Sequence, residues 1–392
     1  MRKEIVSFVS MKMNLSRLYL LFSFFLVWNA QAQDTLTKKK AFVIERDSAT
    51  LFGHIGVNDG ASDEAKLLVG GYVSTYYAYY TDEITNNGLV QIPVMAPRNK
   101  EFGLNMALMS MQYSSKNVRG NFGLHFGDIP KSIWPTEFNM IQEANGGVRL
   151  VKGLWFDAGV FRSHIGVESI QPRENITSST SLVNNYEPYY FTGAKLTYVL
   201  NSKLSLQVNC FNSFNTLTET NKDKLFGFSA VYDPSDRVSI TYNFLTGDES
   251  ADTATIKQRR YYNNIYATIK LNKFILALEA NYGWQENSML KDTNGTASVY
   301  SGLIVARYQF VKKSALYVRG EYLSDPDAVV TGGLNFGNSV MGTTAGIEYK
   351  PYKNVALSLE GRMLQSDKLV FKENRYKVNQ RYEVIFCLDV SF

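Results

Sequence analysis

Histidines and charged side chains are the residues of this sequence that could do chemistry, and the sequence has three histidines, His54, His125 and His164. A hydrolase would need one of them beside a nucleophile and an acid. Only His125 has a nearby carboxylate, Asp128 in the segment LHFGD, and such a pair is far more often polar lining than a catalytic site. No Cys or His spacing matches a metal site. We therefore expect no enzyme, no cofactor, and no catalytic or metal-binding residue.

A larger set of charged residues alternates with apolar ones. In the last fifteen residues, VNQRYEVIFCLDVSF, Arg381, Glu383 and Asp389 occupy one set of alternate positions, while Val384 and Leu388 belong to the other. Successive side chains on a β-strand point to opposite faces, so this segment is predicted to be a strand with one apolar and one charged face. An apolar outer face and a polar inner face are typical of a transmembrane β-barrel.

The same alternation in other segments predicts which charged residues face the inside of such a barrel. Charges on the lipid face would be costly, so water must reach these side chains and the interior should be a hydrated channel. The predicted pore-lining residues are Arg119, Glu143, Arg149, Asp157, Lys195, Lys270, Glu279, Arg307, Arg319, Glu321, Glu348, Glu360, Arg362, Arg381, Glu383 and Asp389.

We expect about half of these charges to form ion pairs that stiffen the wall, and the rest to form a mixed-charge constriction that filters solutes. The expected pairs are Arg319 with Glu321, Glu360 with Arg362, and Arg381 with Glu383.

The longest connection between predicted strands, residues 163–188, is a candidate constriction loop. Connections of this length are usually functional or disordered. Folded inward, it would place Glu168, Arg173 and Glu174 against the wall and set the pore radius; folded outward, it would be an ordinary surface loop. Residues 82–100, which contain Pro93 and Pro97, are a second candidate lid.

The elements that must position these residues are sixteen runs of about ten residues, separated by alternately short and long polar connections. Short turns on one side and long loops on the other are typical of outer-membrane barrels, and an even count leaves both chain ends on the periplasmic side. The runs are residues 68–81, 101–113, 118–128, 139–151, 154–164, 190–200, 204–214, 225–233, 237–247, 261–271, 273–284, 299–309, 314–324, 339–349, 354–365 and 378–392.

Composition supports this all-β interpretation. Aromatic residues make up 14% of the 392 residues, with 25 Tyr and 24 Phe, which favours strands over helices. After the first 32 residues no run of 18 apolar residues occurs, so a helical membrane protein is not expected. A soluble β-sandwich is the main structural alternative, but its strands are shorter.

The first 32 residues have the features of a cleaved signal peptide. Lys12 and Arg17 precede an apolar run that ends near Trp28, and Ala30 and Ala32 form a small-x-small cleavage site. Met11 or Met13 could be the true initiator. Cleavage removes four cations and one anion, which lowers the formal net charge from +5 to +2 and gives no electrostatic reason to expect nucleic-acid binding. Residues 33–67 are predicted to be a periplasmic leader, and residues 68–392 the barrel.

The chain resembles a known family in several stretches. IGVESIQPRENITSSTSLVNNYEPYYFTGAKLTY, GYVSTYYAYYTDE followed by APRNKEFGLNMALM, RGNFGLHFGD and the terminal Phe392 are similar to the OmpL-like β-barrel porins of Bacteroidetes-type outer membranes. The likeness covers about residues 68–392. It implies an outer-membrane porin and a final strand whose Phe392 is read by the barrel-insertion machinery, but it brings no assigned substrate.

We therefore predict an antiparallel transmembrane β-barrel of about 16 strands in the outer membrane of a Gram-negative bacterium. Its short turns would be periplasmic and its long loops extracellular. The predicted function is passive diffusion of small hydrophilic solutes, with membrane lipid, small polar solutes and the insertion machinery as partners and a homo-oligomer as a further possibility. A closed or narrow barrel acting in surface structure or adhesion is the alternative. A barrel hydrolase and a fatty-acid transporter are less favoured, the latter because the inferred lumen is charged.

Overall fold

The computed structural model describes residues 43–46, 62–83, 88–90, 92, 95–219, 221–332, 339–373 and 375–392. The chain divides into two compact units, Met1–Val43 and Ile44–Phe392, and the description below concerns the second. The predicted signal peptide, the choice of initiator and most of the predicted leader lie outside the described residues, and so does Pro93 of the second candidate lid.

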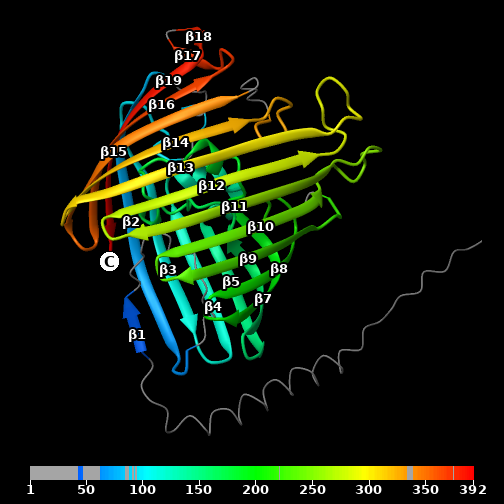
Figure 1. Cartoon of the computed structure of the whole chain (residues 1–392), viewed down its shortest axis with the longest axis vertical. Coiled ribbons are helices and arrows are strands. Elements are labelled where there is room, and N and C mark those ends of the chain that lie inside the picture. Colours follow the sequence, from blue (N-terminus) through cyan, green and yellow to red (C-terminus); the bar gives the residue numbers. More distant parts are fainter. Residues whose placement is uncertain are drawn as a thin grey trace, which may run out of the picture. The chain divides into compact units, whose positions relative to one another are not determined.

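Strands make up most of the described chain, and sixteen of them form the barrel (Figure 1). A further strand, β1 (Val43–Arg46), precedes them. The barrel strands are β2 (Lys66–Tyr80), β3 (Phe102–Ser114), β4 (Val118–Phe126), β5 (Ile141–Val151), β6 (Leu154–Arg162), β7 (Tyr190–Asn201), β8 (Leu204–Phe211), β9 (Leu225–Ser235), β10 (Val238–Asp248), β11 (Arg259–Leu271), β12 (Phe274–Gln285), β13 (Ala297–Val311), β14 (Ser314–Ser324), β15 (Val340–Tyr352), β16 (Val355–Ser366) and β19 (Gln380–Ser391).

The barrel closes because every strand pairs antiparallel with both of its neighbours. Sequential strands pair from β2 to β16, β16 pairs with β19, and β19 returns to pair with β2. At this seam the backbone N–H of Gly71 donates to the carbonyl of Phe392 at 2.7 Å, and the N–H of Phe392 donates to the carbonyl of Gly71 at 2.9 Å. Closure leaves no strand edge exposed, which a barrel in lipid requires.

The two ends of the barrel differ in their connections. At one end, seven turns of two or three residues join β3 to β4, β5 to β6, and so on to β15 and β16. At the other end the connections are longer and carry the small elements. These are α2 (Asp128–Ile133), the 3₁₀ turns η1 (Thr136–Phe138) and η2 (Pro172–Glu174), α3 (Leu182–Asn185), and the hairpin of β17 (Phe371–Glu373) and β18 (Tyr376–Val378).

Exposure alternates along the strands as the sequence predicts. On β19 the side chains of Val384 and Phe386 are exposed, whereas those of Arg381, Glu383 and Ile385 are buried. The exposed side chains face outward, and the charged ones face the interior. The predicted barrel of about sixteen antiparallel strands is therefore confirmed, with each predicted run matching one strand. No described helix is long and apolar enough to cross a membrane.

Candidate functional site

The barrel interior contains the candidate site, and β14 shows how the sequence builds it. Tyr317, Arg319 and Glu321 alternate with the outward-facing Leu316 and Val318, which are about half exposed. Arg319 is 2% exposed and its side chain is fully enclosed. Three large polar side chains therefore enter the barrel side by side from one strand.

The neighbouring strand β15 makes room for these side chains. Its inward positions opposite Glu321 and Tyr317 are Gly342 and Gly346. A Cβ atom at Gly342 would lie 2.5 Å from the side chain of Glu321, and one at Gly346 would lie 2.3 Å from the Tyr317 ring. Between them, Thr344 faces Arg319 and accepts a hydrogen bond from its Nη2 at 3.2 Å. The small residues of β15 thus allow β14 to project large polar side chains.

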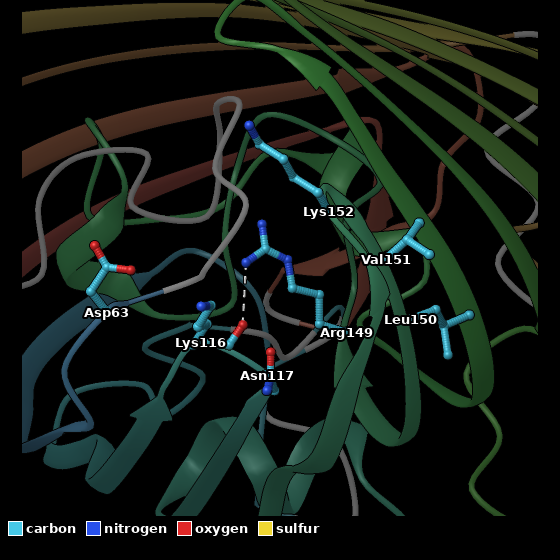
Figure 2. A pocket seen from close by; sticks show the side chains of 7 residues that line it. All are labelled: Asp63, Lys116, Asn117, Arg149, Leu150, Val151 and Lys152. Carbon is cyan, nitrogen blue, oxygen red and sulfur yellow. Dashed lines mark hydrogen bonds between the residues drawn. The ribbon is translucent and has the colours of Figure 1, made fainter.

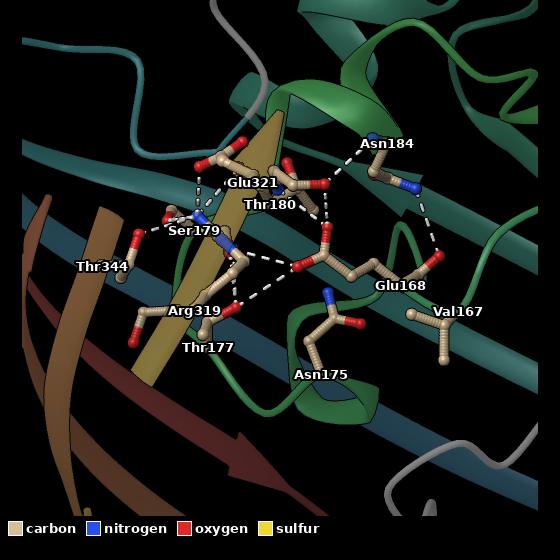
Figure 3. A network of polar contacts seen from close by, with 12 residues as sticks. Val167, Glu168, Asn175, Thr177, Ser179, Thr180, Asn184, Arg319, Glu321 and Thr344 are labelled. Atoms are coloured by element: carbon tan, nitrogen blue, oxygen red, sulfur yellow. Dashed lines mark hydrogen bonds and ion pairs between the residues drawn. The ribbon is translucent and has the colours of Figure 1, made fainter. Parts of the chain in front are cut away.

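Residues 163–188, called the inner loop below, fold inward and meet these side chains. Figure 3 shows Arg319 at the centre of the contact. Its Nη1 donates to Glu168 Oε1 at 2.9 Å, Thr177 Oγ1 at 2.8 Å and the carbonyl of Ser179 at 2.6 Å. A buried guanidinium is stabilised only when its N–H groups are paired in this way. Arg319 therefore holds the inner loop to the wall.

Carboxylates on three strands of the wall accept hydrogen bonds from the backbone of the inner loop. Glu360 on β16 accepts from the N–H of Ser178 at 2.8 Å and of Ser179 at 3.2 Å. Glu279 on β12 accepts from the N–H of Val167 at 2.7 Å, and Glu321 on β14 accepts from the N–H of Leu182. These buried carboxyl groups accept hydrogen bonds from the loop backbone, so the contacts fix the loop inside the barrel.

A chain of ion pairs continues from this contact along β16 and β19. Arg362 pairs with Glu321 at 2.8 Å and with Glu383 at 3.7 Å. Arg381 pairs with Glu383 at 2.8 Å and with Asp82 at 3.1 Å. These five side chains are each at most 9% exposed.

Two of the three expected ion pairs are confirmed, since Arg319 and Glu321 lie 3.5 Å apart and Arg381 pairs with Glu383. The expected pair of Glu360 with Arg362 was wrong. Glu360 accepts hydrogen bonds from the inner loop instead, and Arg362 pairs with carboxylates on the neighbouring strands.

The remaining predicted lining residues lie in separate groups. Arg119 on β4 pairs with Asp157 on β6 at 2.5 Å, and Asp157 faces Lys195 on β7. Arg307 on β13 pairs with Glu348 on β15 at 2.5 Å. The others are Glu143, which lies 3.5 Å from Arg162, Asp389, which accepts a hydrogen bond from Tyr72, and Lys270 and Arg149 near the short-turn end.

The three residues predicted to form the constriction, Glu168, Arg173 and Glu174, differ in their contacts. Glu168 is held by Arg319 and by the N–H of Ser181, and Glu174 pairs with Arg162 at 2.9 Å. Arg173 lies over the Tyr72 ring, with its guanidinium 5.1 Å from the ring centroid. A cavity of about 80 Å³ separates Arg173 from the wall, and two others beside the inner loop measure about 20 Å³ each. The inner loop therefore packs tightly against the wall where it crosses these strands.

Part of the second candidate lid is also packed against the barrel. Asn105 on β3 accepts a hydrogen bond from the N–H of Ala96 at 2.6 Å, and Tyr80 donates to the carbonyl of Ala96 at 2.7 Å. Arg98 donates to both carboxylate oxygens of Asp128 at 2.8 Å. The described residues of this loop therefore cover the long-loop end near β2 and β3.

The surroundings of His125, the histidine considered for catalysis, are those of a packed structural residue. His125 is fully buried, with its ring packed edge-on against Trp134 and Nδ1 3.3 Å from the amide of Gln142. Asp128 is bound to Arg98 and to the hydroxyl of Tyr76. In the described parts of the chain, no three His, Cys, Asp or Glu side chains are grouped as metal ligands.

A hollow of about 560 Å³ opens at the short-turn end, between the turn that follows β3 and the turn that follows β5 (Figure 2). We call it the short-turn hollow. Its lining includes Lys116, Arg149 and Lys152. Water also reaches the interior at Gln112 on β3, which is exposed on the inward side of its strand. The inner loop therefore leaves part of the interior open to solvent.

Sequence reasoning missed several residues that build this site. Thr177, Ser178 and Ser179 bind Arg319 and Glu360 through backbone and hydroxyl groups, and Thr344 completes the contact of Arg319. The Ser and Thr richness of residues 177–181 was the available signal, because hydroxyl groups are suited to bind enclosed charges.

A closed barrel of sixteen strands, with short turns at one end, a charged interior and a long inward-folded loop, is typical of outer-membrane porins. Residues 66–392 match the model of the family described as "Putative beta-barrel porin-2, OmpL-like". The chain belongs to this porin family. The predicted resemblance is thus confirmed, and the family supports an outer-membrane location.

Solved structures show the same fold at low sequence identity. The outer membrane channel DcaP of Acinetobacter baumannii has a TM-score of 0.59 and 13% identity, covering 86% of this chain and all of its own. An anion-selective porin from Comamonas acidovorans has a TM-score of 0.56 and 9% identity. The match covers 84% of this chain and 100% of the porin. A trimer form of OmpT from Vibrio cholerae has a TM-score of 0.53 and 11% identity. The match covers 84% of this chain and 99% of the OmpT chain. No curated protein sequence matches this chain.

Proposed function

We propose that this porin forms a water-filled channel for passive diffusion of small hydrophilic solutes, and that it has no enzymatic activity. The observation that carries the proposal is a closed barrel with charged side chains on its inner wall, some of which water reaches. At about sixteen strands a barrel is wide enough for an aqueous channel, because side chains alone do not fill it. Solutes would pass beside the inner loop.

In this proposal the inward charges line the path and the inner loop narrows it. Arg119, Asp157 and Lys195 are among them, at inward positions on β4, β6 and β7. Glu168 and Glu174 would keep the inner loop in place, because both carboxylates are engaged by arginines. Arg173 would face the narrow space beside the wall.

The proposal also includes export of the chain and contacts with lipid, with the insertion machinery and with further copies of the chain. The chain would be exported through a cleaved signal peptide at residues 1–32, and its apolar outer face would contact lipid. The insertion machinery would read Phe392, which is 57% exposed at the seam. A homo-oligomer is consistent with the trimer form of the similar OmpT from Vibrio cholerae.

The experiment that tests this function is a liposome-swelling assay with purified, folded protein. Vesicles with protein should swell faster than protein-free vesicles in arabinose or glucose, and more slowly as the sugar grows to raffinose. Swelling equal to that of protein-free vesicles, in samples shown to contain folded barrel, would contradict it.

The tight cavities beside the inner loop favour a second candidate, a closed barrel with a role in surface structure or adhesion. Spaces of about 20 Å³ hold roughly one water molecule, so no solute passes there. The swelling assay separates the two functions, because a closed barrel would fold and insert without admitting any sugar.

A further inference from the structure

Two carboxyl groups lie side by side where the end of the inner loop meets the wall. Glu187 of the loop is 1% exposed, and Glu279 on β12 is 6% exposed. The side-chain amide of Asn281 donates to Oε1 of Glu187 at 3.0 Å and to Oε1 of Glu279 at 2.8 Å. We call Glu187 and Glu279 the carboxyl pair. Both groups are enclosed, so water does little to screen a repulsion between them.

The two members of the carboxyl pair differ in the donors that they meet. Glu279 accepts hydrogen bonds from the N–H of Val167 at 2.7 Å and from the side-chain amide of Asn264 at 3.1 Å. Glu187 accepts at Oε1, while in the described chain its Oε2 accepts no hydrogen bond. A carboxyl oxygen that carries a proton is itself a donor. The donors around Glu279 therefore suit a carboxylate, and Oε2 of Glu187 suits the oxygen that carries the proton.

The groups that face Glu187 are acids or phenols. They are Glu279 on β12, Tyr262 and Tyr266 on β11, and Glu168 and Tyr189 of the inner loop. The charge of Glu168 is already paired with Arg319. His164, at the start of the loop, has its ring against Phe191, with 5.5 Å between the ring centroids. Burial, followed by the charge of Glu279, therefore raises the pKa of Glu187 well above its usual value.

The carboxyl pair holds both ends of the inner loop to one part of the wall. The N–H of Gly166 donates to Asn264 on β11 at 3.3 Å, and that of Val167 donates to Glu279 on β12. Glu187 brings the last residues of the loop to the same two strands. The middle of the loop is bound separately, to β14 and β16. A repulsion within the pair would therefore loosen the ends of the loop while its middle stays attached.

We propose that the carboxyl pair shares one proton and that this proton regulates the width of the channel. This inference rests on the proposed channel function and names its regulation. While the pair holds the proton, the ends of the inner loop stay against β11 and β12 and the path is narrow. When the pH rises and the proton leaves for water, two adjacent negative charges repel each other, the ends of the loop move from the wall, and the path widens.

The test measures the single-channel conductance of the full chain in planar bilayers, with the same pH on both sides, from about pH 5 to about pH 9. Wild-type conductance should rise with pH in one transition about two pH units wide, as expected for the loss of one proton. Uncharged polyethylene glycols of increasing size measure the width of the channel in the same bilayers. A larger polymer should enter the channel and lower its current above the transition than below it.

Glu187→Gln keeps the shape of the side chain but cannot ionise. It should lose the transition, and its conductance should stay at the wild-type value of low pH. Glu279→Gln should move the transition to lower pH, because its amide does not repel the charge of Glu187; this shift tests the pair if Glu187→Gln does not fold. The control is Glu137→Gln, at an exposed position in η1, which should keep the wild-type transition.

Three results would overturn the inference and leave the channel function intact. They are a conductance that is constant or falls as the pH rises, a transition that persists in Glu187→Gln, and a conductance change without a change in the size of polymer that enters. The last result would show an effect of charge on the current and not of channel width. An absence of current from folded barrel would overturn both the inference and the channel function.

Discussion

At the scale of single residues, Arg319 joins the wall to the inner loop. Its guanidinium binds Glu168, Thr177 and Ser179 of the loop and lies beside Glu321 of its own strand. Lysine could not replace it, because one ammonium group cannot reach acceptors that a planar guanidinium contacts on two sides.

Replacing Arg319 with Met should release the inner loop. Glu168 and Glu321 would remain buried, and removal of one member of a buried ion pair costs about 3–5 kcal/mol. We expect faster proteolysis within residues 163–188 and a larger conductance. Arg307→Met is the matched control, since Arg307 pairs with Glu348 of the wall. Equal protease resistance of Arg319→Met and wild type would show that Arg319 does not anchor the loop.

Glu187 makes the stability of the inner loop depend on pH. Burial, followed by the charge of Glu279 and a hydrogen bond with its carboxyl group, raises the pKa of Glu187 well above its usual 4.5. The folded state therefore holds a proton that the unfolded state releases. Its stabilising effect is complete below about pH 4.5 and is lost as pH rises through the folded pKa.

The thermal stability of the wild-type inner loop, followed by proteolysis on heating, should therefore decrease as the pH rises from about 4.5. Glu187→Gln should be more stable than wild type at high pH and should vary less with pH, because its amide remains neutral. Glu137→Gln, at an exposed position in η1, is the control. Parallel pH profiles for wild type and Glu187→Gln would contradict this assignment.

At the scale of elements, the two faces of each barrel strand have different surroundings. Val384 on β19 is 49% exposed on the outer face, whereas Gln112 on β3 is exposed on the inner face. An arginine on the lipid face of a barrel costs about 2–4 kcal/mol near the membrane centre, and an arginine in contact with water avoids this cost.

Val384→Arg should therefore reduce the yield of heat-modifiable, folded barrel in the membrane, while Gln112→Arg should assemble normally. Gel migration of unheated samples measures the folded fraction. If both arginine variants assembled equally well, the assignment of the two faces would be wrong.

The strands could be predicted from sequence because each one carries a local signal. The alternation of Val384 and Phe386 with Glu383 repeats every two residues and needs no knowledge of distant parts of the chain. The direction of the charged side chains could be predicted for the same reason.

The inner loop could not be predicted in this way. Residues 177–181 have no periodic pattern, and their position depends on Glu360, whose bond to Ser178 spans 182 positions of sequence. The sequence of this loop is compatible with both inward and outward folding. The partner of Arg362 also depended on register, since Glu321 lies two strands away, beyond β15.

At the scale of the whole molecule, the barrel combines a sealed wall, a fixed inner loop and two ends of different charge. The seam of β19 and β2 closes the wall, and the inner loop occupies part of the interior. Each of the seven short turns contains a basic residue, and the short-turn hollow opens at this end. This arrangement predicts a narrow aqueous path beside the inner loop.

Single-channel recording of folded wild-type protein in planar bilayers tests this central claim most directly. An open path of fixed width predicts discrete current steps whose size increases linearly with voltage. If folded barrel, confirmed by its gel migration, gave no current steps even at high protein load, the interior would be closed and the proposed channel contradicted.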